Sequence, residues 1–515
     1  MNVIEQRKVI SNIAKKCWDV ATELRGSMDA NEYKNYFLGI IFYKFLSDKV
    51  EKFFASQLEG ENLSYEDAWT LDEYHDVLID VSLQRLGYLI EPRYLFKNLL
   101  KMYHAGSFSV DIFDEAIRSV VNYTKGQESE ETFNGLFDAM DLMSNHLGNT
   151  VAEKNEKIGK TMIAIDSCEI DFDATDVDIL GAAYEELIGK FASDAGQKAG
   201  EFYTPTNMSK LVSRLATLGL TDIKAVFDPT CGSGSLLLQV GNYANVRNYY
   251  GQEKSYTTYN LARQNMLLHG IPYSDFKIVN CNTLTEDVVF KDMQYTVQVA
   301  NPPYSLAYDP KSINKADPRF APYGDLPQKK YADWLFVEHM IHHMADDGRI
   351  VALLPHGVLF RGQAEGKIRK FMVANQNYID AVIELPEKCF QGTGISVDCV
   401  IFKKNREENE NNICFINASG CYTKVGDKNT ITDEDIDRIV AAYAERKDID
   451  KFCHVATISE IEDNDYNLTV NRYIDTSKKE EPVDIAKVKE ELVEIHKRKQ
   501  VAIDKVNATM TLLGL

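Results

Sequence analysis

The tetrapeptide Asn301-Pro302-Pro303-Tyr304 combines the residue types and order best suited to a chemical reaction in this chain. It follows the alternating apolar run 295–300, which predicts a strand, and the carboxyl ends of strands are where open α/β sheets place their chemistry. The two prolines fix φ and remove two backbone donors. The Asn301 side-chain oxygen and the Pro302 carbonyl can then each accept one N–H of an exocyclic amine, and Tyr304 can stack on the attached ring. The tetrapeptide therefore predicts a site that holds a flat, weakly nucleophilic amino group.

A glycine turn upstream predicts a cofactor pocket. The stretch 226–238 has the pattern of a strand, a tight turn and a helix start, in which Gly232 and Gly234 permit φ > 0 and the close approach of a ligand. Leu237 stands where a dinucleotide fingerprint has its third glycine, which argues against NAD. Glu253 follows the turn by about 20 residues and is placed to accept from both ribose hydroxyls. A nucleoside cofactor without a pyrophosphate fits this pattern better, and S-adenosylmethionine is one.

Two other stretches add to the expected pocket. Asn282, after the next predicted strand, is suited to bond an adenine edge, although a plain turn residue is an equally good interpretation. Thr204 is predicted as an N-cap and Pro205 as the first helical residue, so free N–H groups at that helix start would hold the carboxylate of the cofactor. A well-capped helix without a ligand is the alternative for this second stretch.

The elements that must position these residues change in type along the chain. Residues 1 to about 165 show helical spacing of apolar residues, a second helical pattern covers 133–147, and no strand alternation precedes residue 220. Beyond it, predicted strands at 223–227, 248–252, 276–281, 295–300, 349–354, 379–384 and 398–403 alternate with predicted helices at 205–217, 234–244, 255–269, 331–345 and 364–374. This alternation predicts a doubly wound parallel α/β sheet, with 398–403 as an antiparallel edge strand.

The last part of the chain gives weaker signals. Residues 405–412 are expected to form a polar surface loop, and a smaller mixed segment runs to about 475. The tail from Glu480 is charged and helical, with a thin apolar stripe that includes Val488, Leu492 and Ile495. A stripe of this kind on a terminal helix suggests docking against another helix.

Charge limits the ways in which the chain can bind nucleic acid. The net charge is −21, which argues against strong autonomous DNA binding, so a partner is expected to supply much of the grip if DNA is the substrate. Local exceptions follow the tetrapeptide, although solvated faces are an equally good interpretation of each: Lys311, Lys315, Arg319, Lys329, Lys330, Arg361, Lys367, Arg369 and Lys370.

Composition also argues against a disordered, a zinc-binding and a membrane protein. Hydrophobic residues make up 44% of the 515 residues, as expected of a folded protein with several domains. The nine cysteines include no CxxC pair and no Cys/His cluster, so reduced thiols and no zinc site are expected. There is no N-terminal signal pattern and no apolar run of about 18 residues. A cytoplasmic protein with no membrane contact is therefore expected.

Taken together, these motifs resemble the modification (M) subunit of type I restriction-modification systems, which is an N6-adenine DNA methyltransferase. Further stretches carry the resemblance across nearly the whole chain: 18–26, 32–49, 354–361, 368–370, 384–395, 465–468 (Asp-Tyr-Asn-Leu) and 472–473. The resemblance implies a Rossmann-like methyltransferase domain at 166–475. It also implies an N-terminal all-helical domain at 1–165 for partner or DNA contacts and a helical tail at 476–515 for subunit docking.

Carried over residue by residue, the resemblance implies methyl transfer from S-adenosyl-L-methionine to the N6 of a flipped adenine, without a metal or a covalent intermediate. Asn301, Pro302, Pro303 and Tyr304 match the catalytic motif, and Tyr304 and Phe390 match residues beside the target base. A core aromatic is the alternative for Phe390. The cofactor-binding positions are Glu201, Phe202, Tyr203, Thr204, Pro205, Thr206, Asp228, Cys231, Gly232, Ser233, Gly234, Ser235, Glu253 and Asn282. Asn282 departs from the pattern, because many relatives carry Asp there.

The partners implied by the resemblance are double-stranded DNA, a specificity (S) subunit, a second M subunit and, as an optional member, a restriction (R) subunit. Three rival functions stay open. The Asn-Pro-Pro-Tyr motif also occurs in protein glutamine N5-methyltransferases, which lack the long helical region and the 465–468 signature. A non-catalytic scaffold of a DNA-defence complex is disfavoured by the intact Asn301, Gly232 and Glu253. An enzyme with its own fused recognition domain is disfavoured because the chain is expected to end too soon for one.

Overall fold

The computed structural model describes residues 3–26, 28–168, 177–194, 204–287, 290–390, 395–426, 428–476 and 485–514. The chain forms two compact units, Met1–Ile474 and Asp475–Leu515. The second unit holds helix α17 (Ile485–Leu513), and every described side chain along it is exposed. In the described parts of the chain, no helix has the length and apolarity needed to cross a membrane.

The first part of the larger unit is helical, and its described residues contain no strand before Asp222. The helices are α1 (Val3–Arg25), α2 (Ala30–Leu58), α3 (Tyr65–Trp69), α4 (Asp72–Arg85), α5 (Phe96–His104), α6 (Val110–Thr124), α7 (Glu130–Phe133), α8 (Val151–Ser167) and α9 (Val177–Asp194). The helix predicted for 133–147 is wrong. Helix α7 ends at Phe133, Gly135 has φ 68°, and successive turns follow instead, with Leu136 and Phe137 buried without a helix.

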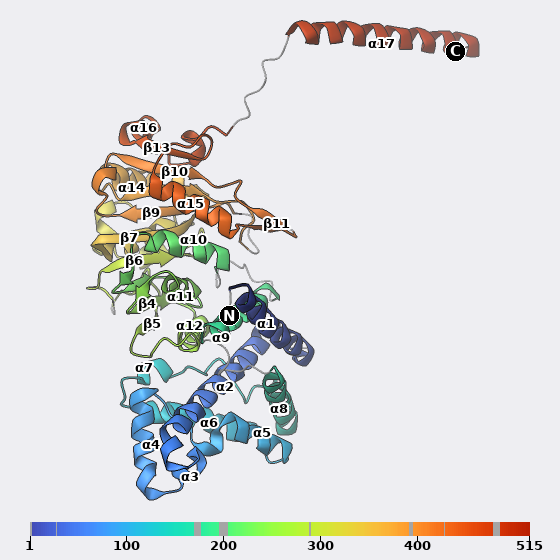
Figure 1. The fold of residues 1–515 in the computed structure, drawn as a ribbon. Helices are drawn as coiled ribbons and strands as arrows, with labels where there is room; N and C mark the ends of the chain where they lie inside the picture. The colour runs from blue at the N-terminus through green and yellow to red at the C-terminus, as the bar shows by residue number, and fades with distance from the viewer. Residues whose placement is uncertain are drawn as a thin grey trace. The chain divides into compact units, whose positions relative to one another are not determined.

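The larger unit contains a nine-stranded sheet with the order β13-β10-β8-β9-β7-β6-β2-β4-β5, most of whose strands are labelled in Figure 1. Its strands are β2 (Val226–Asp228), β4 (Tyr249–Glu253), β5 (Phe276–Asn280), β6 (Tyr295–Ala300), β7 (Met344–Pro355), β8 (Ile379–Glu384), β9 (Val397–Lys403), β10 (Asn412–Asn417) and β13 (Cys453–Thr457). All neighbours pair in parallel except where β9 and β13 run against them. The predicted α/β class with a mostly parallel sheet is confirmed.

Helices connect these strands and pack on the sheet. They are α10 (Thr206–Thr217), α11 (Ser235–Gly241), α12 (Tyr256–Leu268), α13 (Asp333–His342), α14 (Gln363–Ala374), α15 (Asp433–Glu445) and α16 (Ile458–Asp463). Two small sheets, β1 (Asp222–Ile223) with β3 (Asn245–Val246) and β11 (Thr423–Val425) with β12 (Lys428–Thr430), complete the unit. Because one core contains buried residues of the N-terminal helices and of β2, β6 and β7, the helical part and the sheet share a hydrophobic interior.

Strand β9 corrects one prediction and β10 another. The antiparallel direction of β9 is as predicted, but β9 lies between β7 and β8 and is not an edge strand. Its residues Val397–Phe402 are all buried, which requires cover on both faces and neighbours on both sides. Strand β10 begins at Asn412, inside the stretch predicted as a polar loop, and its four central residues are buried.

Candidate active site

The Asn-Pro-Pro-Tyr loop leaves the carboxyl end of β6, as the sequence predicted. Ala300 is the last residue of β6 and pairs with Ala352 of β7. Asn301 therefore lies at the carboxyl-terminal ends of the parallel strands. Asn301 is half-buried, and both ends of its amide are held. Its Nδ2 donates to Thr204 Oγ1 at 3.1 Å, and its Oδ1 accepts from the Tyr304 hydroxyl at 2.5 Å. The amide orientation is therefore fixed with the oxygen on the Tyr304 side.

Tyr304 and Phe390 lie against each other beside this amide. Their ring centroids are 5.8 Å apart and the rings meet edge to face at 87°. Burial raises the pKa of the Tyr304 hydroxyl well above its usual value, so the hydroxyl keeps its proton and donates. Phe390 is 5% exposed, and in this state it packs as a core aromatic, which leaves its predicted contact with a base as a prediction.

A network of hydrogen bonds and ion pairs, which was not predicted from sequence, holds the residue that follows the Asn-Pro-Pro-Tyr loop. Ser305 has φ 51°, a costly conformation for a residue other than glycine, and its N–H donates to Asp333 Oδ1 at 2.7 Å. The other Asp333 oxygen accepts from Arg361 Nη2 at 2.7 Å, and Arg361 Nε donates to Glu365 at 3.0 Å. Asp333 opens helix α13. In the sequence, Asp333 looks like an ordinary acidic residue in the first turn of a helix. No nearby motif indicates that it binds the Ser305 N–H and Arg361.

The glycine turn between β2 and α11 has the predicted backbone. Gly232 and Gly234 have φ of 56° and 80°. Glu253, at the end of β4, accepts from the Gly232 N–H at 3.2 Å with one oxygen and from the Ser255 N–H at 2.7 Å with the other. Each carboxylate oxygen keeps a further lone pair, so Glu253 is still able to accept from ribose hydroxyls.

Asp228 is the last residue of β2 and precedes the same turn. It is 2% exposed, and its Oδ1 accepts from the Thr230 N–H at 2.8 Å. Burial raises the pKa of this carboxyl to about 7 despite that bond, and the nearby Glu253 adds to the rise. A cationic group bound next to Asp228 would reverse the shift, which fits a cofactor that carries an ammonium and a sulfonium.

The serine and cysteine side chains of the turn are committed to local packing. Ser233 and Ser235 share a hydrogen bond of 2.9 Å between their hydroxyls. Cys231 is buried, and burial raises the pKa of its thiol well above the usual value. A Cβ on Gly251 would lie 2.9 Å from Cys231 Sγ, so the turn and β4 are in close contact. Cys231 is thus a small packing residue here.

The predicted cap of α10 is wrong. Pro205 occupies the N-cap position, no side chain caps the helix, and α10 begins at Thr206. The Thr204 hydroxyl accepts from Asn301 instead, which links this segment to the Asn-Pro-Pro-Tyr loop. The predicted contacts of Glu201, Phe202 and Tyr203 lie outside the described residues.

One cavity of about 310 Å³ joins the two halves of the predicted site, and its volume is at the lower end of ligand pockets. Among the predicted residues, Glu253, Asn282, Asn301 and Pro303 line it. Residues not predicted also line it: Pro229, Thr230, Gln252, Lys254, Thr283, Leu284, Thr285, Leu306, Ala307, Tyr308, Asp309, Ser312, Ile313 and Phe336. Asn282 holds its own loop, because its Oδ1 accepts from the Leu284 N–H at 3.3 Å.

The wall formed by Thr283 and Leu284 is fixed from behind by Arg319. This side chain is 3% exposed, and its guanidinium donates to the Thr283 carbonyl at 2.7 Å and to the Leu284 carbonyl at 3.4 Å. Asp317 accepts from the same guanidinium at 2.7 Å. Arg319 was considered from sequence as a surface basic residue, and that interpretation is wrong.

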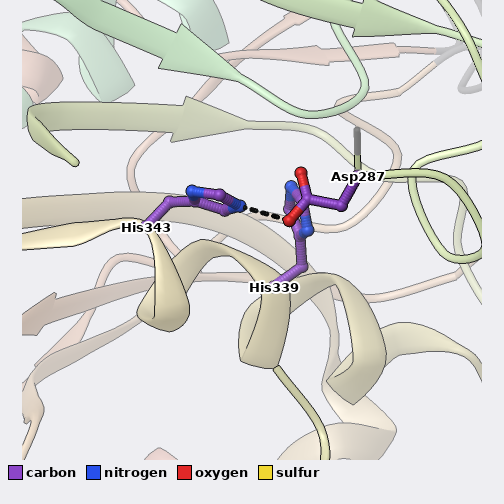
Figure 2. A group of neighbouring side chains, drawn as sticks. All are labelled: Asp287, His339 and His343. Carbon is purple, nitrogen blue, oxygen red and sulfur yellow. Dashed lines mark hydrogen bonds and ion pairs between the residues drawn. The ribbon is translucent and has the colours of Figure 1, made fainter. Parts of the chain in front are cut away.

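Behind Arg319 lies a buried cluster of Asp287, His339 and His343 (Figure 2), whose donor atoms lie within 4.8 Å of one another. His343 Nδ1 bonds the Met293 carbonyl at 2.8 Å, and its Nε2 faces Asp287 Oδ2 at 3.0 Å. Arg319 Nη1 lies 3.1 Å from His339 Nδ1. An arginine can only donate, so His339 carries its hydrogen on Nε2 and has no lone pair there for a metal. In this tautomer His339 is unsuited to bind a metal ion. His339 Nε2 and Asp287 Oδ1 are buried and have no hydrogen-bond partner among the described residues.

Comparisons with known proteins agree with this geometry. The sequence profile described as N-6 DNA Methylase matches residues 175–482, and the profile of the HsdM N-terminal domain matches residues 13–165. The chain belongs to the N-6 DNA methylase family. The type I restriction enzyme MpnII methylase subunit of Mycoplasma pneumoniae is 34% identical over 95% of this chain and 94% of its own length. The type I restriction enzyme MjaVIII methylase subunit of Methanocaldococcus jannaschii is 34% identical over 90% of this chain and 78% of its own.

A solved structure supports the same assignment. The type I restriction-modification system methyltransferase subunit from Streptococcus thermophilus is 40% identical and has a TM-score of 0.85, covering 91% of this chain and all of its own. This N-6 DNA methylase is therefore a type I modification subunit, and it transfers methyl groups from S-adenosyl-L-methionine to adenine N6 in DNA. The rival glutamine methyltransferase and scaffold functions are not favoured.

Proposed function

We propose that Asn301 Oδ1 and the Pro302 carbonyl accept the two hydrogens of the target adenine N6 while Tyr304 stacks on the base. The observation that carries the proposal is that Asn301 and Glu253 line one cavity, so an amide acceptor and a ribose-type acceptor face the same ligand space. The amide oxygen has a second lone pair besides the one that Tyr304 uses. The base amine would take that position without displacing the tyrosine.

Orientation is the main contribution that these side chains would make. Adenine N6 is a poor nucleophile because its lone pair is delocalised into the ring, and accepting both hydrogens favours a pyramidal nitrogen whose lone pair is free to attack. The bound cofactor supplies an electrophilic methyl group. Asn301 and the Pro302 carbonyl would hold N6 with its lone pair toward that methyl group, and the proton that N6 loses on methylation would pass to solvent. Flipping the base costs a few kcal/mol, and stacking on Tyr304 returns about 1–3 kcal/mol.

The remaining predicted residues would hold the cofactor. Glu253 would bind the ribose hydroxyls, Asn282 the adenine edge and Asp228 the cationic part of the amino acid group. The backbone of the turn from Cys231 to Ser235 would approach the ligand closely, because Gly232 and Gly234 adopt positive φ. The residues from Glu201 to Thr206 keep their predicted role near the carboxylate, and Phe390 its role near the base.

Partner subunits would supply much of the DNA binding that this acidic chain lacks. We infer that double-stranded DNA and a specificity subunit are partners, since the net charge of −21 disfavours strong binding of DNA by this chain alone. A second modification subunit and, in restriction-competent assemblies, a restriction subunit would join in the cytoplasm. Residues 1–165 would serve partner or DNA contacts, residues 166–475 methyl transfer, and residues 476–515 subunit docking. The exposed apolar residues Leu492 and Ile495 of α17 suit that last role.

The decisive test is Asn301→Ala. The variant should lose methyl transfer and keep cofactor binding, because the amide is assigned to the base and not to the cofactor. Transfer of tritiated methyl groups to DNA measures the first property, and calorimetric titration of S-adenosylmethionine measures the second. Wild-type transfer by the variant would remove the assignment of Asn301.

A further inference from the structure

The basic residues around the catalytic loop divide into two groups in the structure. The residues of one group already have partners within the protein. Arg319 and Arg369 are 3% and 4% exposed and donate to backbone carbonyls, and Arg361 is paired with Asp333. Lys367 pairs with Asp325 at 2.6 Å, and Lys370 lies 4.9 Å from the centre of the Tyr466 ring. The second group is Lys311, Lys315, Lys329 and Lys330, which are all exposed. We call these four residues the rim lysines.

The rim lysines border the cavity that holds Asn301. Lys311 stands between Asp309 and Ser312, which both line the cavity. The Lys329 carbonyl accepts from the N–H of Tyr308, another lining residue, at 2.9 Å. Ala332 N–H donates to the carbonyl of the lining residue Leu306 at 3.0 Å, so the two sides of this segment run next to each other at the cavity mouth. Lys311 and Lys329 therefore lie next to residues that line the cavity, and Lys315 and Lys330 follow them closely in the sequence.

The charge of this segment is opposite to that of the chain. Residues 305–332 hold five basic and three acidic residues, whereas the whole chain holds 57 and 78. Two of the three acids are already engaged, Asp317 by Arg319 and Asp325 by Lys367. Within the described residues, no side-chain ion pair is found for Lys311, Lys329 or Lys330, and Lys315 lies near enough to Asp325 to help lower the pKa of that carboxyl.

We propose that the rim lysines bind backbone phosphates of the DNA strand that carries the target adenine. The proposal rests on the proposed function and adds the surface that receives the substrate. Glu253 lines the cavity below, together with Lys254. The rim lysines carry the larger positive charge at the mouth, so they are placed to hold the backbone phosphates there while the base enters the cavity.

The salt dependence of DNA binding tests this surface. Each phosphate contact contributes about 0.9 to the slope of log K against log salt concentration, so four contacts correspond to about 3–4. Fluorescence anisotropy with a labelled mixed-sequence duplex, between about 50 and 200 mM KCl, measures the slope for the full chain in complex with its specificity subunit, because the acidic chain alone is not expected to bind DNA strongly. In the variant with all four rim lysines changed to glutamine, the slope should fall by about 2–4 and the affinity at the lowest salt by at least about tenfold.

A control variant separates the outcomes. Lys224→Gln with Lys291→Gln removes two exposed lysines that precede β2 and β6, at the amino edge of the sheet, and should leave the slope within about one unit of the wild type. An equal slope and affinity in wild type and rim variant overturns the proposal, and so does an absence of DNA binding by both proteins at the lowest salt. The measurement involves no chemistry, so a failure of methyl transfer in the wild type would count against the proposed function and not against the rim.

Discussion

Replacing Tyr304 by phenylalanine separates the two roles that the structure gives this side chain. Phenylalanine keeps the ring that meets Phe390 edge to face, and it removes the hydroxyl that donates to Asn301 Oδ1 at 2.5 Å. The amide would then be held only by its contact with Thr204 at 3.1 Å. The variant therefore tests whether the orientation of Asn301 contributes to the rate separately from stacking.

The expected size follows from the lost bond. A neutral hydrogen bond is worth about 0.5–1.5 kcal/mol, and each 1.36 kcal/mol changes a rate tenfold, so Tyr304→Phe should slow methyl transfer by about 2–10-fold. Tyr304→Ala should lose the stacking energy as well, about 1–3 kcal/mol, and fall by a further ~5–150-fold. Neither variant should change cofactor affinity by more than about twofold, because Tyr304 does not line the cavity.

The assay is single-turnover transfer of a tritiated methyl group to DNA, with calorimetric titration of the cofactor on the same preparations. Tyr65→Phe is the matched control. The Tyr65 hydroxyl donates to the Ile90 carbonyl at 2.9 Å and not to Asn301, and Tyr65 does not line the cavity, so this variant should transfer at nearly the wild-type rate. A wild-type rate for Tyr304→Phe would refute the orienting role of the hydroxyl. Equal rates for Tyr304→Phe and Tyr304→Ala would refute the stacking role.

Three other variants probe the cofactor side. Gly232→Val should raise the dissociation constant of S-adenosylmethionine at least ~10-fold, because a β-branched residue is strained at φ 56°, and an unchanged calorimetric constant would contradict this. Asp228→Asn should raise the melting temperature of the cofactor-free protein more at pH 8 than at pH 5. The folded-state pKa of about 7 exceeds the ordinary value of 3.8, so ionisation of the native carboxyl costs stability as pH rises through 7, and equal gains at both pH values would speak against it. Arg319→Lys should raise KM for the cofactor ~10-fold with little change in kcat, because one ammonium cannot replace the fork that holds the carbonyls of Thr283 and Leu284, and a fall in kcat alone would argue for another role.

Local patterns predicted the parts of the fold that local physics determines. The strands 295–300 and 379–384 end where expected, because short apolar runs bounded by turn residues mark them in sequence. The Asn-Pro-Pro-Tyr loop after β6 and the glycine turn after β2 also lie where the sequence predicted. Strand β10 was missed because its first residue is the polar Asn412 and its pairing with β8 depends on the rest of the sheet. Phe137 was assigned to a helix because its apolar neighbours have helical spacing, yet tertiary burial replaces the helix with turns.

The hydrogen bonds that hold the site residues in place could not be predicted from the sequence, for a different reason. The bond from Asn301 to Thr204 spans 97 positions and the bond from Ser305 to Asp333 spans 28. Neither pair has a fixed spacing that a motif could record, since each depends on how strands are ordered in the sheet. Arg319 likewise resembles a surface basic residue in sequence. Only the fold shows that it is buried and donates to the carbonyls of Thr283 and Leu284 in the cavity wall.

The reversed direction of β9 has a consequence for how this enzyme can diverge. Because β8 and β9 are antiparallel neighbours, the connection between them does not need to cross a face of the sheet. Phe390, which belongs to this connection, lies against Tyr304, and no crossover helix constrains the length of the connection. Insertions and deletions between residues 385 and 396 are therefore expected to change the surroundings of Tyr304 while leaving every strand in register. Related enzymes with different substrate preferences are expected to differ in length there before they differ in the sheet.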